Sequence, residues 1–556
     1  MNGHPDGEIF HRWRAQPAPL LPVLHALHDR DGYLSEEALR EVSRELDIPI
    51  ADLFGTVTFY HHFAREPEGR NRPRVCTGPV CRLRGSDAIL RALEGATPMP
   101  CPGRCDAPVP VLVGDGTRTA TPEGALSEAS SPLPPPAPEG VEECVFSSIR
   151  EPGRGTEPGY RATGGYEGLE RALASEPEAV LRSVEESGLA GRGGAGFPTG
   201  RKWRAVAEAP GEPKTIVCNA DEGEPGCFKD RAILDHDPHA VIEGMVAAGY
   251  ATGANRGFLY LRYEYPETLR ILERALSEAE SAGWLGEEIR GSGFGFRIHL
   301  RRGAGAYICG EETSLLNSLE GKHPFPRNRP PYPVTQGYEG LPTVINNVET
   351  LASVPHILRH GAEWYRSLGR GEHAGTKVIS LSGDIVRPGN YEVPLGFPLR
   401  ELLEEWAGGA PEGRTIQAVT MAGLSGGFLS AADLDVTLDE PSIRARGSFL
   451  GAGGIMVFDD RREMVEVARS AMEFFAEESC GKCFPCRIGT RRMVERLSGT
   501  GPAEPGDWVD EMTDLSETMK QTSACGLGMA APLIVDSLLR GFPEQVSGRL
   551  GKGGPG

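Results

Sequence analysis

Four cysteines near the carboxyl end restrict most severely what this chain can fold into. Cys480, Cys483 and Cys486 are separated by two residues each, and Cys525 follows farther along the chain. Two consecutive C-x-x-C steps place three thiolates around one small volume, and a remote fourth thiolate can complete the shell. A zinc site usually shows two separated pairs instead. The spacing therefore predicts a [4Fe–4S] cluster, with zinc as the alternative.

A second set of cysteines lies in the first fifth of the chain. Cys76 and Cys81 are separated by four residues, and Cys101 and Cys105 by three. Two pairs on two loops can each hold one iron of a [2Fe–2S] cluster, whereas the alternative, a zinc ribbon, prefers two-residue gaps. The remaining cysteines stand alone, and we interpret them as buried thiols: Cys144, Cys218, Cys227 and Cys309.

Charge and hydropathy narrow the class of protein. The 556 residues include 58 Lys and Arg and 78 Asp and Glu, a formal net charge of −20. Such an acidic surface repels nucleic acid and anionic membranes. No stretch approaches the roughly 18 apolar residues of a membrane span, so we expect no direct membrane insertion. The first fourteen residues lack an apolar signal core, so we expect a cytoplasmic chain.

Residue patterning divides the chain into segments. Leu20, Val23, Leu24 and Leu27 share one face of a predicted helix, and Ser35 can cap the next helix. Short apolar runs predict strands over residues 72–126, and the proline-rich segment 127–140 predicts a linker. Strand and helix patterns then alternate to about residue 351, residues 376–458 look β-rich with one helix near 399–406, and residues 463–547 look helical.

A glycine-rich segment, GRGGAGF at residues 191–197, lies between two predicted helices. Consecutive glycines let backbone N–H groups approach an anion, and Arg192 and Lys202 can add positive charge. The segment is neither a Walker loop nor a G-x-G-x-x-G that directly follows a strand. A tight turn is the structural alternative.

Two further polar segments follow predicted strands. Residues 219–226 read NADEGEPG, and their carboxylates would need donors if buried, such as ribose hydroxyls or flavin N–H groups. A metal site or a solvated acidic loop are the alternatives. Residues 303–313 open a predicted helix whose N-terminus could hold a phosphate. Asn346 and Asn347 suit a flavin edge or phosphate, or else a turn or cap.

These strings together resemble a known family. GRGGAGFPTGRKW, NADEGEPG, GAGAYICGEET, INNVETL and ESCGKCFPCR are similar to signatures of the flavin subunit of respiratory complex I and its soluble relatives. Residues 17–126 resemble that family's thioredoxin-like [2Fe–2S] subunit, usually a separate chain. The resemblance implies a multidomain α/β fold with a helical bundle and thioredoxin-like [2Fe–2S] domain (1–126), a proline-rich linker (127–159), a Rossmann-like FMN- and NAD-binding domain (160–360), a β-grasp-like domain (361–460) and a helical [4Fe–4S] domain (461–556).

The resemblance also implies roles for individual residues. Glu224 and Glu312 would be catalytic, facing the nicotinamide nucleotide. Residues implied to bind FMN or NAD(H) are Gly191, Gly193, Phe197, Lys202, Asn219, Asp221, Glu222, Gly310, Glu311, Arg329, Tyr332, Asn346 and Asn347. The eight cysteines of the two sets would hold the clusters. Ala190, Ala205 and Cys227 depart from the residues usual in the family.

The implied activity is hydride exchange between NAD(H) and FMN, followed by single-electron transfer to the clusters. The fused arrangement resembles the beta subunit of NAD-dependent molybdenum or tungsten formate dehydrogenases, which implies a large molybdopterin and iron–sulfur catalytic subunit as partner. The peripheral arm of complex I and the diaphorase of NAD-reducing hydrogenases are alternatives. A non-enzymatic electron-transfer scaffold is the alternative of another class.

Overall fold

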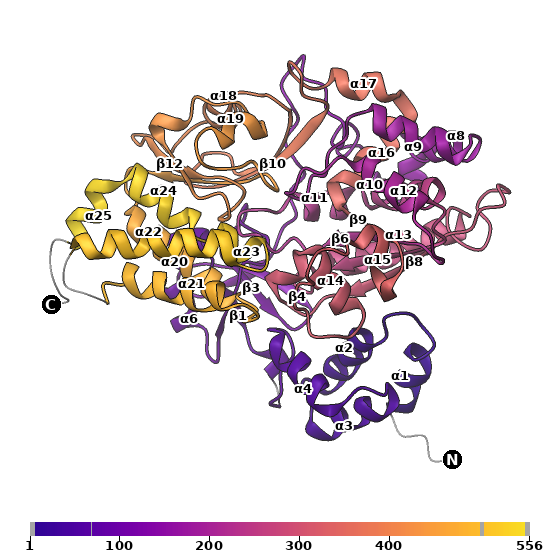
Figure 1. The fold of residues 1–556 in the computed structure, drawn as a ribbon, viewed down its shortest axis with the longest axis horizontal. Helices are drawn as coiled ribbons and strands as arrows, with labels where there is room; N and C mark the ends of the chain where they lie inside the picture. The colour runs from indigo at the N-terminus through magenta and orange to yellow at the C-terminus, as the bar shows by residue number, and fades with distance from the viewer. Residues whose placement is uncertain (1–5, 68, 501–504, 551–556) are drawn as a thin grey trace.

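Three β-sheets organise the chain in the computed structural model, which describes residues 6–67, 69–500 and 505–550 (Figure 1). Two sheets have five strands and the central one has four. The predicted fold class, a multidomain α/β protein with a helical carboxyl end, is confirmed. Within the described residues, no helix combines the length and the apolar character that crossing a membrane requires.

Four helices form the N-terminal bundle at the lower edge of Figure 1: α1 (Asp6–Trp13), α2 (Leu20–Asp31), α3 (Glu36–Glu45) and α4 (Ile50–Phe59). The predicted apolar stripe of α2 is buried at Leu20, Val23, Leu24 and Leu27. The predicted cap is also present, since the Ser35 hydroxyl accepts the Ala38 N–H at 3.1 Å. Hydrophobic periodicity and capping therefore predicted this bundle correctly.

The first sheet has the order β2-β1-β3-β4-β5, with β1 parallel to β2 and antiparallel to β3. Its elements are β1 (Arg74–Cys76), α5 (Pro79–Leu83), α6 (Ser86–Ala92), β2 (Thr97–Met99), β3 (Pro110–Val113), β4 (Gly116–Ala120) and β5 (Leu126–Glu128). Strand β5 spans the boundary that we expected at residue 126, because Ser127 and Glu128 pair with Thr119 and Arg118. The linker therefore cannot begin at Ser127 in this structure.

The central sheet is entirely parallel, in the order β8-β7-β6-β9. The strands are β6 (Thr215–Ala220), β7 (Arg256–Leu261), β8 (Arg297–Arg302) and β9 (Thr343–Asn347). The helices of this domain are α7 (Glu157–Ala162), α8 (Glu167–Leu173), α9 (Pro177–Glu186), α10 (Thr199–Glu208), α11 (Lys229–His236), α12 (Pro238–Thr252), α13 (Pro266–Ser281), α14 (Glu312–Leu319), α15 (Pro333–Gln336), α16 (Val348–His360) and α17 (Ala362–Ser367). The chain runs outward from β6 to β8 and then returns to the other side of β6. This order places a topological switch point between β6 and β9, where open α/β sheets bind ligands.

The third sheet has the order β11-β10-β14-β12-β13. Its elements are β10 (Thr376–Gly383), β11 (Gly389–Pro394), β12 (Ile416–Thr420), β13 (Phe428–Ser430), β14 (Gly454–Asp459) and the short helix α19 (Glu440–Arg444). The helix predicted near 399–406 is present as α18 (Leu399–Glu401), continued by a π-helical turn over Leu402–Trp406. The carboxyl end is helical as predicted: α20 (Met464–Glu477), α21 (Phe484–Leu497), α22 (Pro505–Thr522), α23 (Gly526–Ala530), α24 (Leu533–Gly541) and α25 (Pro543–Leu550).

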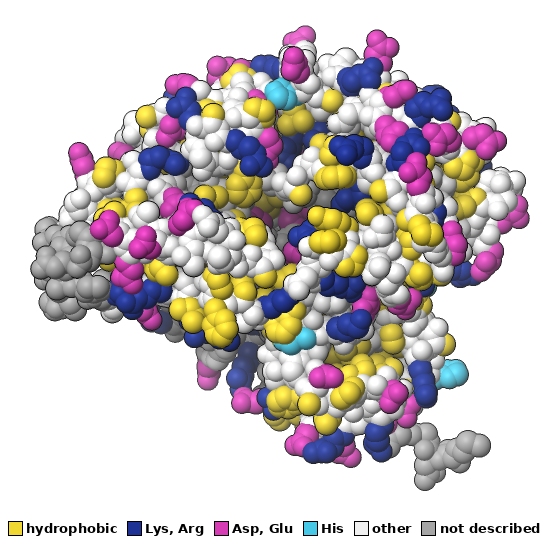
Figure 2. Space-filling view, in the orientation of Figure 1, with side chains coloured by type: hydrophobic (Ala, Val, Ile, Leu, Met, Phe, Trp, Pro, Cys, Tyr) yellow, Lys and Arg dark blue, Asp and Glu magenta, His cyan; other side chains and the backbone are white. Residues whose placement is uncertain are grey.

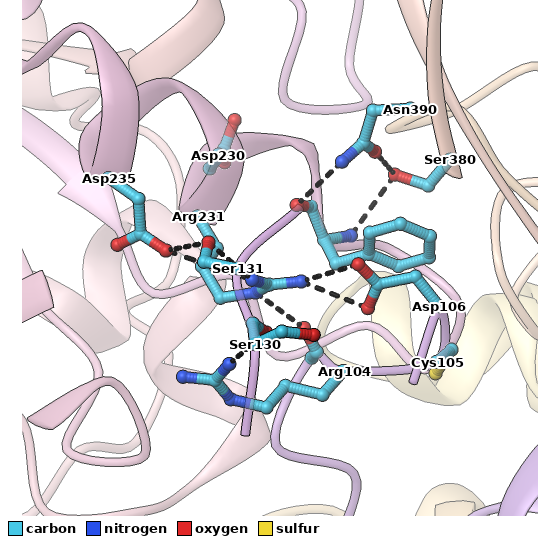
Figure 3. Close-up of polar contacts among 12 residues, drawn as sticks. Arg104, Cys105, Asp106, Ser130, Ser131, Asp230, Arg231, Asp235, Ser380 and Asn390 are labelled. Carbon is cyan, nitrogen blue, oxygen red and sulfur yellow. Dashed lines mark hydrogen bonds and ion pairs between the residues drawn. The ribbon is translucent and has the colours of Figure 1, made fainter. Parts of the chain in front are cut away.

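A buried ionic junction joins the first sheet to the central one (Figure 3). Arg231 on α11 donates from one nitrogen to both carboxylate oxygens of Asp106, each at 2.9 Å, and from Nε to the Gly103 carbonyl at 3.1 Å. Its remaining nitrogen donates to the Ser131 hydroxyl at 3.0 Å, which in turn donates to Asp235. The proline-rich segment is thus held against α11 at Ser131.

We expect Arg231→Met to lower the free energy of unfolding by about 3–5 kcal/mol, because Asp106 and Asp235 would stay buried without their cation. The exposed pair Arg400–Asp435 offers a control, and Arg400→Met should change stability by less than about 1 kcal/mol. Denaturant unfolding followed by circular dichroism measures both. Equal losses in the two variants would contradict the importance of this junction.

Candidate functional site

Polar residues from four segments meet at the carboxyl edge of the central sheet. The Asn219 side chain, at the end of β6, donates to the Gly310 carbonyl at 2.8 Å. Trp203 on α10 donates to the Asn346 side chain at 2.8 Å, and Lys202 donates to the Ile345 carbonyl at 3.0 Å. Asn219, Gly310, Asn346 and Lys202, which were chosen from separate motifs, therefore lie together at the ends of β6 and β9, beside the switch point.

The glycine-rich segment closes back on itself beside β9. The Gly191 N–H donates to the Phe197 carbonyl at 2.9 Å. A Cβ on Gly193 would lie 2.9 Å from the Cβ of Asn347, so a larger residue would force the two segments apart. We expected Arg192 to add positive charge to this segment, and that expectation is wrong. Its guanidinium is buried and donates to the Tyr365 hydroxyl at 2.9 Å. A buried guanidinium needs hydrogen-bond partners, and Tyr365 on α17 supplies one.

The neighbouring residues Glu311 and Glu312 have different main contacts. The Glu311 carboxylate caps α14 by accepting the Thr313 and Ser314 N–H groups at 3.0 and 2.9 Å. The prediction of a phosphate at this helix N-terminus is therefore wrong, because a carboxylate already occupies those donors. Glu312 lies 3.5 Å from the Lys202 ammonium and 2.9 Å from the Arg329 guanidinium. It thereby holds both cations at the edge of the site.

The acidic segment is buried, which excludes a solvated loop. Asp221 Oδ2 is buried without a hydrogen-bond partner among the described residues, and burial raises the pKa of this carboxyl well above its ordinary value. Glu222 accepts the Asp230 N–H at 3.0 Å and the Tyr265 hydroxyl at 2.9 Å, and burial raises its pKa to about 7. Because donors occupy both Glu222 oxygens, a metal site is not supported. The unpartnered Asp221 oxygen fits a ligand that donates hydrogen bonds.

Glu224 is turned toward the third sheet. One of its oxygens accepts the Leu424 and Ser425 N–H groups at 2.7 and 3.1 Å, and the other accepts the hydroxyls of Ser425 and Tyr307. The carboxylate thus ties the acidic segment to the loop after β12. Phe197 and Tyr332, both expected near the nucleotide, remain about half exposed, and they can offer aromatic faces to a ligand.

Two buried lysines were missed from the sequence. Lys229 lies 2.6 Å from Asp230 and 2.9 Å from Glu349, and it donates to the Asn347 side chain at 3.3 Å. Lys377 donates to the Arg192 carbonyl at 3.3 Å, and burial lowers its pKa to about 8. A single lysine outside any motif gives no sequence signal. Lys229 thus lies at the end of β9 with its charge matched by two carboxylates, whereas Lys377 lies against the glycine-rich segment.

The N-terminal cysteines converge as predicted. Cys76 ends β1, Cys81 lies on α5, and Cys101 and Cys105 follow β2. All four thiols are buried, the sulfurs of Cys101 and Cys105 are 3.4 Å apart, and the Cys76 thiol lies within hydrogen-bonding reach of Cys81 and Cys101. Four buried thiols on two loops of one small volume fit a [2Fe–2S] cluster.

The C-terminal cysteines line a cavity. Cys480, Cys483, Cys486 and Cys525 face it, together with Ile308 and Pro326 from the central domain. Cys525 lies at the N-cap position of α23 and makes no side-chain capping hydrogen bond there. This donor set fits a [4Fe–4S] cluster. The 3₁₀ turn Tyr307–Gly310 has Ile308 on this cavity and Gly310 at the Asn219 side chain, so one turn separates the two sites.

Known protein families match each of these parts. Residues 184–356 match the Nuo51 FMN-binding domain, and residues 466–549 match the NADH-ubiquinone oxidoreductase-F iron–sulfur binding region. Residues 7–108 match the thioredoxin-like [2Fe–2S] ferredoxin, and residues 378–429 match the SLBB domain, where we expected a β-grasp-like domain. The combination defines the class: the chain is an NADH-oxidising diaphorase subunit with FMN, [2Fe–2S] and [4Fe–4S] cofactors.

Several known proteins are similar to this chain in sequence or in structure. One component of the NADH-quinone oxidoreductase of Rhizobium meliloti is 48% identical over 69% of this chain and 92% of its own length. NAD-reducing hydrogenase HoxS subunit alpha of Cupriavidus necator is 37% identical over 98% of this chain and 94% of its own. A crystal structure of an NAD⁺-reducing [NiFe]-hydrogenase in the H₂-reduced state aligns with a TM-score of 0.81 at 32% identity, covering 96% of this chain and 93% of that one. The chain belongs to the family of these flavin-binding subunits, and the predicted resemblance is confirmed.

We expect Cys525→Ala to abolish the low-temperature paramagnetic signal of the reduced [4Fe–4S] cluster while FMN stays bound, since the thiol faces only the cluster cavity. Cys144→Ala, at a buried thiol outside both sets, is the matched control and should keep the signal. Electron paramagnetic resonance and flavin fluorescence measure the two outcomes. Stoichiometric zinc without iron in anaerobically purified protein would contradict the assignment.

We expect Glu224→Lys to weaken NADH oxidation more than FMN retention, because the carboxylate lies at the Tyr307 edge of the site and its replacement reverses the local charge. Tyr307→Phe removes one donor to that carboxylate but keeps its charge, so it should have a smaller effect. NADH–ferricyanide activity per bound flavin distinguishes a loss of NADH oxidation from a loss of FMN in the two variants. Unchanged activity in fully flavinated Glu224→Lys protein would falsify a role at the nucleotide.

Proposed function

We propose that this diaphorase subunit works in a cytosolic NAD-dependent formate dehydrogenase, which converts formate and NAD⁺ to CO₂ and NADH. The observation that supports it is the fusion of a thioredoxin-like [2Fe–2S] domain with the flavin and [4Fe–4S] domains in one chain. Formate would be oxidised on a large molybdopterin and iron–sulfur subunit. The four cysteines outside the two sets are scattered singly and buried, so this chain offers no further cysteine-built metal centre besides the two clusters.

Residues of this chain would bind and orient the cofactors. FMN, when bound, exchanges a hydride with the nicotinamide and single electrons with the clusters, and in formate oxidation the electrons end on NAD⁺. We assign Gly191, Gly193, Asn219, Asp221 and Asn347 to the flavin, since they line the switch point between β6 and β9. The Tyr307–Gly310 turn would exclude water between this site and the [4Fe–4S] cavity. Both cofactors would then lie within the protein interior, where fixed polar groups act strongly.

The nucleotide would lie at the open side of the same site. We assign Phe197 and Tyr332 to its rings, because both keep about half of their surface exposed. Glu312 would act at the nucleotide while holding Lys202 and Arg329, and Glu224 would act from the loop after β12. In Figure 2 this face of the molecule is hollowed near its centre, between the third sheet and the helices of the central domain, and the hollow offers room for entry.

An NAD-reducing hydrogenase is the second candidate. The observation that favours it is the match to the HoxS alpha subunit over 98% of this chain, which includes the same fusion. The two candidates differ in the metal of the partner subunit, and this chain would perform the same hydride exchange in both. A complex I assembly would require a quinone-reactive membrane partner.

Purification of the native complex through this subunit tests the proposal. We expect a co-purifying molybdenum- or tungsten-pterin chain and formate-dependent NADH production. A nickel–iron chain with H₂-dependent NADH production would assign the chain to a hydrogenase, and a quinone-reactive membrane assembly would assign it to complex I. The isolated subunit should reduce a dye with NADH in every case, so that activity serves as the control for intact protein.

A further inference from the structure

One buried guanidinium bridges the flavin site and the [2Fe–2S] site. Arg262 directly follows β7 and is buried. One of its terminal nitrogens donates to the Cys101 carbonyl at 2.9 Å, and the other donates to the Glu222 carbonyl. Cys101 belongs to the N-terminal cysteine set, whereas Glu222 belongs to the acidic segment of the flavin site. The two cofactor sites therefore share this side chain as part of their common wall.

The guanidinium is half of a buried charge pair. Arg262 donates to both carboxylate oxygens of Glu264, at 3.1 and 2.9 Å, and Glu264 is buried as well. Both side chains line a small cavity whose walls also include Cys101, Asp221 and Gly223. The cavity therefore touches the cluster loop, the flavin segment and both members of the pair. Charges in such an interior act over a low effective dielectric constant.

An iron–sulfur cluster responds to charges of this kind. Reduction adds one negative charge to a cluster that four thiolates already make anionic, and its potential depends on nearby charge, hydrogen bonds and solvent exposure. A buried cation beside the cluster favours the reduced state, and a buried anion disfavours it. Arg262 and Glu264 hold opposite charges at the same wall, so their effects on the cluster must have opposite signs.

We propose that Arg262 and Glu264 form a charge pair, supplied by the flavin domain, that sets the reduction potential of the N-terminal [2Fe–2S] cluster. Arg262 is a positioning residue that acts through the Cys101 carbonyl. The proposal rests on Cys101 as a cluster ligand and is independent of which partner subunit oxidises the second substrate.

The loop that carries Cys101 and Cys105 has other contacts that would hold it in place if Arg262 or Glu264 were replaced. Arg231 donates to the Gly103 carbonyl and to Asp106 without involving Arg262. Tyr265 approaches so closely that a Cβ on Gly103 would lie 2.2 Å from its hydroxyl, and Gly103 has a φ of 64° that suits glycine. Because these contacts remain, removal of one charge can change the potential without displacing the cysteines.

The test is a redox titration of the holoprotein, followed by the paramagnetic signal of the reduced [2Fe–2S] cluster. Arg262→Gln keeps hydrogen-bond donors but removes the cation, so the ratio of reduced to oxidised cluster at a fixed potential should fall several-fold. Glu264→Gln removes the anion, so the same ratio should rise several-fold. The double variant should return toward the wild-type ratio. The [4Fe–4S] signal should stay unchanged in all three, and the ratios are compared between samples of equal FMN content.

Arg297→Gln is the matched control, because Arg297 pairs with Glu287 at an exposed end of β8 and should not shift the titration. Shifts in the same direction for both single variants, or no shift in either, would overturn the proposal, since a merely structural contact gives no opposition of sign. Absence of a [2Fe–2S] signal in the wild-type chain would overturn it too. If Arg262→Gln does not fold, Glu264→Gln is compared with Glu264→Asp, which keeps the anion and should therefore keep the wild-type ratio; an equal rise in both variants would overturn the proposal.

Discussion

The parallel arrangement of the central sheet is the constraint on which the rest of the site depends. Since β6, β7, β8 and β9 all run in one direction, their carboxyl ends open on one edge. The segments that follow them carry Asn219 to Glu222, Arg262 to Tyr265, and Gly303 to Gly310, and β9 itself ends with the two asparagines. Both cysteine sets then face loops from this edge, the N-terminal set through Arg262 and the C-terminal set through Ile308.

Buried charges fix how the domains sit on that edge. An unpaired buried ion is costly, so Arg231, Lys229 and Arg262 each require carboxylates that lie in defined positions. Lys229 is matched by Asp230 and Glu349, which also connect to the end of β9. Removal of one partner would leave the other charge buried. Of these three cations only Arg231 pairs across domains, with Asp106, so this pair is the one that constrains how the first sheet sits on the central domain.

Local patterns predicted the elements well because their causes are local. The spacing of Leu20, Val23, Leu24 and Leu27 and the cap at Ser35 depend on helix geometry alone, and both are present. Three other expectations were decided by a hydrogen-bond partner that the sequence analysis had not considered. Arg192 turns toward Tyr365, Glu311 caps α14 in place of a phosphate, and β5 extends into the expected linker. In each case a partner distant in sequence, or a competing hydrogen bond, decided the outcome.

The sequence by itself determined the chemistry: the spacing of the two sets of four cysteines predicted the clusters, and the family that the glycine-rich and acidic motifs resemble implied FMN and NAD(H), cofactors now supported by family matches. Only the tertiary structure decided how these parts meet. Lys229 and Lys377 stand in no motif, and the importance of both lysines and of Arg262 comes from burial beside residues far away in the chain. A charge gains its effect from the low dielectric environment and from the neighbours that folding provides, and neither can be read from its immediate sequence.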